Sequence, residues 1–127
     1  MSGLINTSKL NNPPEEHELN VANYFSALGY DIEFIPPSNI PNFHAPDIIM
    51  DGIEWEIKSP QGKGKHTIER NISNALLQSR FIIIDLSRIT LNENDCLKQI
   101  NKEFNIRKQI KKLYIITKEK ELIVLKR

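Results

Sequence analysis

Two carboxylates and a lysine stand close together near the middle of the chain, and these residue types can hydrolyse phosphodiester bonds. Asp47 follows Pro46, while Glu56 and Lys58 are separated by a single residue. Carboxylate oxygens suit a hard divalent cation such as Mg²⁺, which generates hydroxide and stabilises negative charge on phosphoryl oxygens. A lysine ammonium on the same side adds positive charge to the same transition state. These side chains therefore predict nuclease chemistry, provided that the fold brings them together.

The dipeptide Asp51-Gly52 predicts a hairpin that would do so. Asp and Gly tolerate the positive φ angles of a two-residue primed turn. If Met50 and Ile53 flank this turn, Asp47 lies opposite Glu56. Side chains alternate between the two faces of a strand, so one face becomes apolar and the other polar. The expected apolar face consists of Ile48, Met50, Ile53, Trp55 and Ile57, and the expected polar face consists of Asp47, Glu54, Glu56 and Lys58, with only Ile49 out of place.

The composition is that of one domain without a strong overall charge. At 127 residues the chain is long enough to bury a core without disulfides or structural metals. Its net charge of +1 gives no global attraction to nucleic acid, so any such binding requires local patches. The single cysteine, Cys96, excludes an internal disulfide and is compatible with a reducing compartment. No apolar run approaches the roughly 20 residues of a membrane span, and no signal peptide is recognisable, so we expect a soluble chain.

Periodicity and turn signals predict an alternation of helices and strands. Residues 1–12 are polar and Asn-rich, so we expect a flexible leader or linker there, followed by a single domain over residues 13–127. Such an α/β succession implies a mixed sheet flanked by helices. The expected helices cover residues 13–28, 67–79 and 92–104, the last extending at most to 110, and the expected strands cover 30–35, the two arms of the hairpin, 81–86, 113–117 and 121–125.

Two further polar side chains are expected to reach the hairpin from the first two helices. Glu18 lies on the apolar stripe of the first helix, three and four residues before Val21 and Ala22, so its carboxylate should point inward. Gln78 shares a polar stripe of the second helix with Asn71. It could hydrogen-bond a carboxylate or an attacking water, and a structural polar cap explains it almost equally well.

The elements Pro46-Asp47 and Glu56-Ile57-Lys58, in this order of helices and strands, resemble the PD-(D/E)xK nuclease superfamily. That superfamily has an αβββαβ core, and the order of elements agrees from about residue 13 to residue 86. The resemblance implies that Asp47 and Glu56 hold Mg²⁺ or Mn²⁺, that Glu18 joins the metal site and that Lys58 positions or activates water. The expected catalytic residues are Asp47, Glu56, Lys58, Glu18 and Gln78, of which Asp47, Glu56 and Glu18 are the expected metal ligands.

A closer resemblance is to the C-terminal tRNA nuclease domains of contact-dependent growth inhibition toxins and related polymorphic bacterial toxins. It covers most of the chain between residues 15 and 86, including Glu18 before Val21-Ala22, the run from Trp55 to Pro60, and Gln78-Ser79 before the strand that ends in Asp85-Leu86. It implies an endoribonuclease toxin that cleaves tRNA in the cytoplasm of a target bacterium. It also implies delivery as the C-terminal part of a larger secreted protein and neutralisation by a cognate immunity protein.

The substrate and its contacts leave alternatives open. Basic residues just beyond the hairpin could contact RNA phosphates, although a solvated mobile loop is an equally good explanation. A DNA endonuclease of the same fold is a second interpretation, against which the near-neutral charge argues mildly. A non-catalytic binding module is a third, and the complete set of catalytic residue types argues against it. The expected substrate-binding residues are Lys63, Lys65, His66, Thr67 and Asn71.

Overall fold

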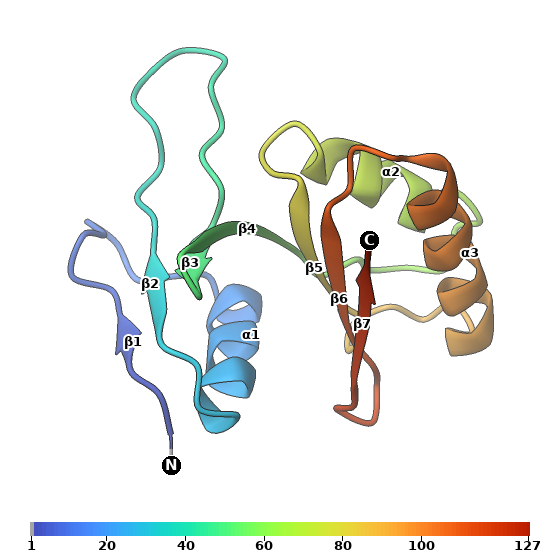
Figure 1. Ribbon diagram of the computed structural model, residues 1–127, viewed down its shortest axis with the longest axis horizontal. Coiled ribbons are helices and arrows are strands. Elements are labelled where there is room, and N and C mark those ends of the chain that lie inside the picture. Colours follow the sequence, from blue (N-terminus) through green and yellow to red (C-terminus); the bar gives the residue numbers. More distant parts are fainter. Residues whose placement is uncertain (1) are drawn as a thin grey trace.

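The seven strands of the computed structural model lie in the sheet in the same order as in the chain (Figure 1). The structure describes residues 2–127. The first pair of strands and the pairs β4–β5 and β5–β6 are parallel, and the other pairs are antiparallel. The predicted mixed α/β fold is therefore confirmed. The elements are β1 (Ile5–Asn6), α1 (Glu16–Ala27), β2 (Ile32–Phe34), β3 (Ile48–Met50), β4 (Ile53–Lys58), α2 (Thr67–Ala75), β5 (Phe81–Asp85), α3 (Glu93–Ile106), β6 (Lys112–Ile116) and β7 (Leu122–Lys126).

The hairpin of β3 and β4 has the predicted register. Met50 pairs with Ile53 and Ile48 pairs with Trp55. The two turn residues, Asp51 and Gly52, have φ angles of 56° and 72°, as a primed turn requires. The alternation of side chains along both strands follows from this register.

Helices cover the sheet on both faces and produce two separate cores. On one face α1 packs against a cluster that includes Trp55, Ile83 and Tyr114. On the other face α2 and α3 pack against a cluster that includes Ile82 and Ile84. Adjacent residues of β5 thus enter opposite cores, which explains why its sequence is apolar without interruption. Among the described residues, no helix is long and apolar enough to span a membrane.

The N-terminal segment differs from the predicted flexible leader. Strand β1 pairs with β2, and the backbone N–H of Gly3 donates to Ser26 O of α1 at 2.8 Å. A side chain at Gly3 would be impossible without a shift of the chain, since a Cβ there would lie 1.8 Å from Tyr30 O. Residues 3–6 are therefore part of the fold, whereas Met1 lies outside the described residues. A strand of two residues cannot display a periodic pattern, so the sequence did not indicate it.

The end of α1 agrees with the prediction, whereas α1 begins three residues later than expected and the end of α2 differs. Gly29, with a φ of 100°, follows α1 as predicted, and the N–H of Tyr30 donates to Phe25 O to close the helix end. Helix α2 ends at Ala75, four residues earlier than expected, and α3 ends at Ile106. Gln78 therefore lies in the turn that follows α2, where its own N–H donates to Ala75 O at 2.9 Å.

Candidate functional site

A cleft of about 620 Å³ brings together four of the five predicted catalytic side chains. Its walls are the segment of residues 10–15 before α1, the long loop of residues 35–47 between β2 and β3, and the turn that follows α2. The long loop and this turn both lie at the top of Figure 1. The side chains in question are Glu18 from α1, Asp47 at the end of the loop, Glu56 from β4 and Gln78 from the turn.

Asp47 is held in place by three hydrogen bonds where the loop enters β3. Its N–H donates to Trp55 O, and its own carbonyl oxygen accepts from Ile35 N–H, both at 2.9 Å. Its carboxylate Oδ2 accepts from the N–H of Ile57 at 2.7 Å. These contacts place the carboxylate at the base of the loop, directly across the hairpin from Glu56.

Glu56 is buried, with 4% of its surface exposed, although it carries an ionisable group. One carboxylate oxygen, Oε2, lies 3.4 Å from Lys58 Nζ, while within residues 2–127 the other, Oε1, has no hydrogen-bond partner. Burial is the main reason why the pKa of Glu56 is raised to about 8. The charge of Asp47 raises this pKa as well, and the charge of Lys58 lowers it by less. Burying a carboxylate oxygen without a hydrogen-bond partner costs free energy, and a bound ligand would remove this cost.

Glu18 reaches the same place from α1. Burial raises its pKa to about 7, and the nearby carboxylate of Asp47 contributes to the same shift. Like charges at short range disfavour simultaneous ionisation. Without a bound cation, the carboxyl groups of Glu18, Asp47 and Glu56 are therefore not all ionised at neutral pH.

The donor set fits a hard divalent cation bound mainly by Asp47 and Glu56. Buried oxygens without partners in the described chain, Glu56 Oε1 and Gln78 Oε1, belong to residues that line the cleft. No three His, Cys, Asp or Glu side chains of residues 2–127 converge closely enough to form a complete cluster for a metal. Mg²⁺ does not require one, because it keeps several waters and binds through one or two carboxylates and substrate phosphate.

Lys58 lies on the same face of β4 as Glu56, as predicted, at the level of Ile84 of β5. Its side chain is 23% exposed and pairs with Glu56. It does not line the cleft itself. The ammonium of Lys58 therefore reaches the cleft only indirectly, as the positively charged neighbour of the Glu56 carboxylate.

The five predicted substrate-binding residues lie away from the cleft. They occupy the loop before α2 and the first turns of that helix, whereas Gln78 follows its other end. Nine residues of helix separate the two ends by about 13 Å. Lys63, Lys65, His66, Thr67 and Asn71 are all absent from the cleft lining.

Local contacts explain three of these five residues. His66 Nδ1 lies 3.3 Å from Glu69 Oε2 on the surface. Thr67 is buried, and the side-chain amide of Asn71 donates to Thr67 O at 2.8 Å. Thr67 and Asn71 thus belong to the internal structure of α2, whereas Lys63, Lys65 and His66 are exposed on the loop before it, outside the cleft.

The loop of residues 35–47 contributes to the cleft in a way that its sequence does not indicate. Phe43 and His44 line it, as do Ser38 and Asn39. The loop shows no periodicity, so nothing in its pattern indicated a wall. The only available signal was the position of these residues a few places before Asp47.

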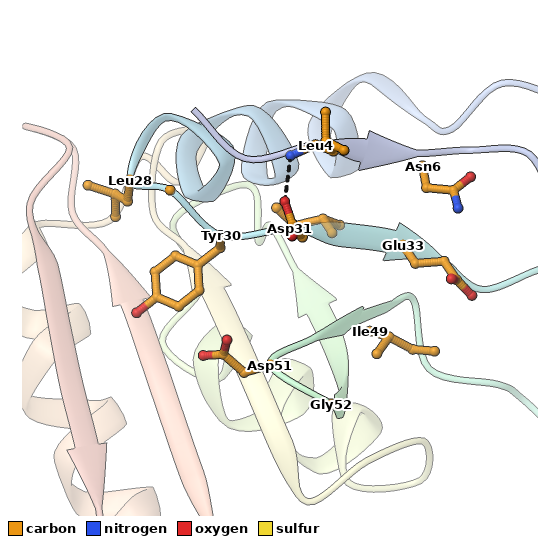
Figure 2. Close-up of a pocket in the computed structure, with 11 residues that line it drawn as sticks. Leu4, Asn6, Leu28, Tyr30, Asp31, Glu33, Ile49, Asp51 and Gly52 are labelled. Atoms are coloured by element: carbon orange, nitrogen blue, oxygen red, sulfur yellow. Dashed lines mark hydrogen bonds between the residues drawn. The ribbon is translucent and has the colours of Figure 1, made fainter. Parts of the chain in front are cut away.

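A second cavity, of about 710 Å³, lies beside the turn of the β3–β4 hairpin and contains none of the predicted catalytic residues (Figure 2). Its walls carry the acidic side chains of Asp31, Glu33 and Asp51. Asp31 accepts from the N–H of Leu4, and Glu33 pairs with Lys9 at 2.8 Å. These contacts anchor the N-terminal segment, so the cavity is a by-product of how β1 joins the sheet.

Comparison with known proteins connects the cleft to a family. Residues 44–122 match the family described as the contact-dependent growth inhibition CdiA C-terminal domain, a range that contains Asp47, Glu56 and Lys58. The fold is similar to that of a chain in the CdiA-CT/CdiI toxin and immunity complex from Burkholderia pseudomallei, with a TM-score of 0.69 and 20% identity over 98% of this chain and 100% of that one. No curated protein matches the sequence.

Proposed function

The chain belongs to the contact-dependent growth inhibition CdiA C-terminal domain family, and we propose that it is a metal-dependent endoribonuclease toxin that hydrolyses phosphodiester bonds of tRNA. One observation carries the proposal. The cleft holds Asp47 and Glu56 across a hairpin, with a lysine beside Glu56 and a buried glutamate oxygen that has no partner in the described chain.

The arrangement supports membership of the PD-(D/E)xK superfamily. The elements α1, β2, β3, β4, α2 and β5 follow the αβββαβ order expected of its core. The Pro-Asp half of the motif ends the cleft loop, and the Glu-x-Lys half lies on β4. Both halves thus meet where two strands of one hairpin face each other.

Each residue has a distinct role in the proposed reaction. Asp47 and Glu56 would hold Mg²⁺ or Mn²⁺, which supplies hydroxide at neutral pH and stabilises negative charge on the phosphoryl oxygens. Lys58 keeps positive charge beside Glu56 and favours its ionised form. Glu18, a third carboxylate of the cleft, would join this metal site directly or through a bound water.

The proposed setting follows from the family. The chain would act in the cytoplasm of a target bacterium after delivery as part of a larger protein. The similar solved structure is a toxin and immunity complex, which supports a cognate immunity protein as the partner of this chain.

Cleavage assays on matched variants test the proposal. Purified wild type, Asp47→Ala, Glu56→Ala and Lys58→Ala are incubated with total tRNA and, separately, with plasmid DNA in Mg²⁺ and in EDTA. Glu54→Ala is the control, because Glu54 is an exposed carboxylate on β4 that does not line the cleft.

We expect the wild type and Glu54→Ala to cut tRNA only with the metal, and the three site variants to be inactive in the assay and non-toxic on expression. Wild-type rates in all three variants would refute the site. Cleavage of plasmid with intact tRNA would instead establish the DNA endonuclease interpretation.

A further inference from the structure

The walls of the cleft are chemically unlike a phosphate-binding surface. Four carboxylates line it, those of Glu15, Glu18, Asp47 and Glu56. Among the residues that the structure describes, no lysine or arginine does so. Phosphate groups are held mainly by arginine and lysine, so this cleft attracts a backbone phosphate only at the metal position.

The remaining polar side chains of the cleft are the imidazole of His44, several amides and a hydroxyl. The side chains of Asn12, Asn39 and Gln78 supply amides, and Ser38 supplies a hydroxyl. Amides both donate and accept hydrogen bonds, which matches the alternating donors and acceptors on the edge of a nucleobase. Within residues 2–127 the buried oxygen of Gln78 has no hydrogen-bond partner, so no donor of the described chain competes with a ligand for it.

One aromatic side chain of the cleft wall is exposed. Phe43 has 55% of its surface accessible and belongs to neither core cluster, whereas Phe34 on the same wall is 2% exposed and packs in the core under α1. An exposed phenyl ring beside amides offers a flat surface on which an unstacked base can lie.

The loop that carries Phe43 is fixed at both ends. The hydrogen bond from Ile35 N–H to Asp47 O closes its base. Four prolines, Pro36, Pro37, Pro41 and Pro46, lie within it and limit its backbone freedom. Phe43 precedes Asp47 by four residues, so the two Cα atoms are at most about 14 Å apart. A base on the ring would therefore lie within reach of a phosphate at the metal position that Asp47 and Glu56 would form.

We propose that the cleft is a nucleobase subsite, in which an unpaired base of the RNA stacks on Phe43 and presents its edge to the amides of Asn39 and Gln78. This inference rests on the proposed function and narrows its substrate class. Bases in a duplex are stacked and their edges in the deep groove are inaccessible to side chains, so the enzyme would cut RNA in single-stranded loops or ends.

Binding measurements separate this inference from the proposed function. The probe is a short fluorescein-labelled single-stranded RNA, compared with the same strand annealed to its complement. All proteins carry Lys58→Ala, which is expected to block cleavage in Mg²⁺ while the residues of the cleft wall remain intact. Phe43→Ala, Phe43→Trp and Ile40→Ala are added to this background, and dissociation constants are obtained by fluorescence anisotropy.

We expect the single strand to bind more tightly than the duplex. Phe43→Ala should weaken binding of the single strand by roughly 10-fold, the typical cost of losing one stacked base, while Phe43→Trp restores it. Ile40→Ala is the matched control, because Ile40 is 67% exposed on the same loop and does not line the cleft, and it should have no effect.

Equal binding of strand and duplex, no detectable binding, or equal affinities of the Phe43→Ala and Ile40→Ala proteins would overturn the subsite. The same holds if Phe43→Ala weakens only the binding of a protein partner. Cleavage by the wild type is measured separately. If the wild type cuts tRNA but Phe43→Ala does not weaken RNA binding, the subsite alone is refuted. A protein that binds through Phe43 and cuts nothing refutes the proposed function alone.

Discussion

Two regions of the molecule bury a glutamate, and they treat it in opposite ways. At the end of α3, Glu103 is 6% exposed, and its Oε1 accepts from Arg107 Nε at 2.6 Å. In the cleft, Glu56 is 4% exposed, but its lysine lies at 3.4 Å and in residues 2–127 its second oxygen contacts no donor. Equal burial therefore does not imply an equal role.

The difference indicates how a structural buried carboxylate can be distinguished from a functional one. A buried carboxylate that is fully paired keeps a local structure together, because loss of either partner leaves a charge without compensation. A buried carboxylate that shares its site with another acid has a shifted pKa and an incomplete shell, both of which are common at functional sites. On this criterion Glu103 stabilises α3, whereas Glu56 is a carboxylate that we propose to bind a cation.

The largest expected effect that separates the two regions is on catalysis. Glu56→Gln should reduce the rate of tRNA cleavage in Mg²⁺ by at least about 10²–10³-fold, a typical loss when one charge-stabilising group is removed from an active site. Glu103→Gln should leave this rate unchanged. Initial rates at saturating metal measure both, and a similar loss in the two variants would erase the proposed distinction.

The next effect concerns stability as a function of pH in EDTA. The pKa values of Glu56 and Glu18 lie at about 8 and about 7, both above the ordinary value of 4.5 because of burial and the charge of Asp47. The folded state therefore holds protons that the unfolded chain has released. This contribution to stability is complete below about pH 4.5 and is lost as the pH rises through the folded-state values.

Urea unfolding between pH 5 and pH 9, as a rough range, should thus show a falling free energy of unfolding, by at most about 1.4 kcal/mol per pH unit for each group. Glu56→Gln should flatten the profile, and Glu103→Gln should not. Saturating Mg²⁺ should flatten it too, because a bound cation favours the ionised carboxylates. A wild-type profile in EDTA without slope would contradict the assignment.

A smaller effect is expected on the stability of the α3 region. Glu103→Gln should lower the free energy of unfolding by about 1.5–3 kcal/mol, since the guanidinium of Arg107 loses its charged acceptor. Glu54→Gln serves as the exposed control and should stay within about 0.5 kcal/mol of the wild type. Thermal unfolding at neutral pH measures the stability of both variants. If Glu103→Gln is as stable as Glu54→Gln, Glu103 does not stabilise α3.

The smallest effect concerns Gln78, the other cleft residue with an unpartnered oxygen in the described chain. Gln78→Leu removes this oxygen and should raise the free energy of unfolding by about 0.5–1 kcal/mol. The same change should slow cleavage by roughly 10-fold, as expected if the Gln78 amide holds a base of the substrate in the cleft. A variant that is less stable and fully active would show that Gln78 is only a structural cap.

The hairpin could be predicted from the sequence because its determinants are local. An Asp-Gly turn fixed the register, and alternation along two strands then placed Asp47 opposite Glu56. The end of α2 could not be predicted in the same way. Leu76 and Leu77 continue a helical pattern, but the chain turns so that Ser79 Oγ can donate to Glu54 O at 2.7 Å, a contact between residues distant in sequence.

The walls of the cleft could not be predicted from the sequence for a related reason. Asn39 and Phe43 belong to an irregular loop, and their approach to Gln78 depends on how two loops meet across the sheet. Neither hydrophobic period nor turn chemistry encodes such a meeting. The pairing of Asp47 and Glu56 across the hairpin could therefore be predicted from the sequence, and the loop walls of the cleft could not.

The strand order has a consequence for the kinetics of folding. Each strand lies beside the one that precedes it in the chain, so no strand has to enter between two strands that already pair. The entropic cost of closing a loop grows with its length, and pairing each strand with its predecessor leaves only the intervening segment to be closed at each step. A chain that emerges from a narrow pore, whichever terminus comes first, can thus add one strand after another to a growing edge.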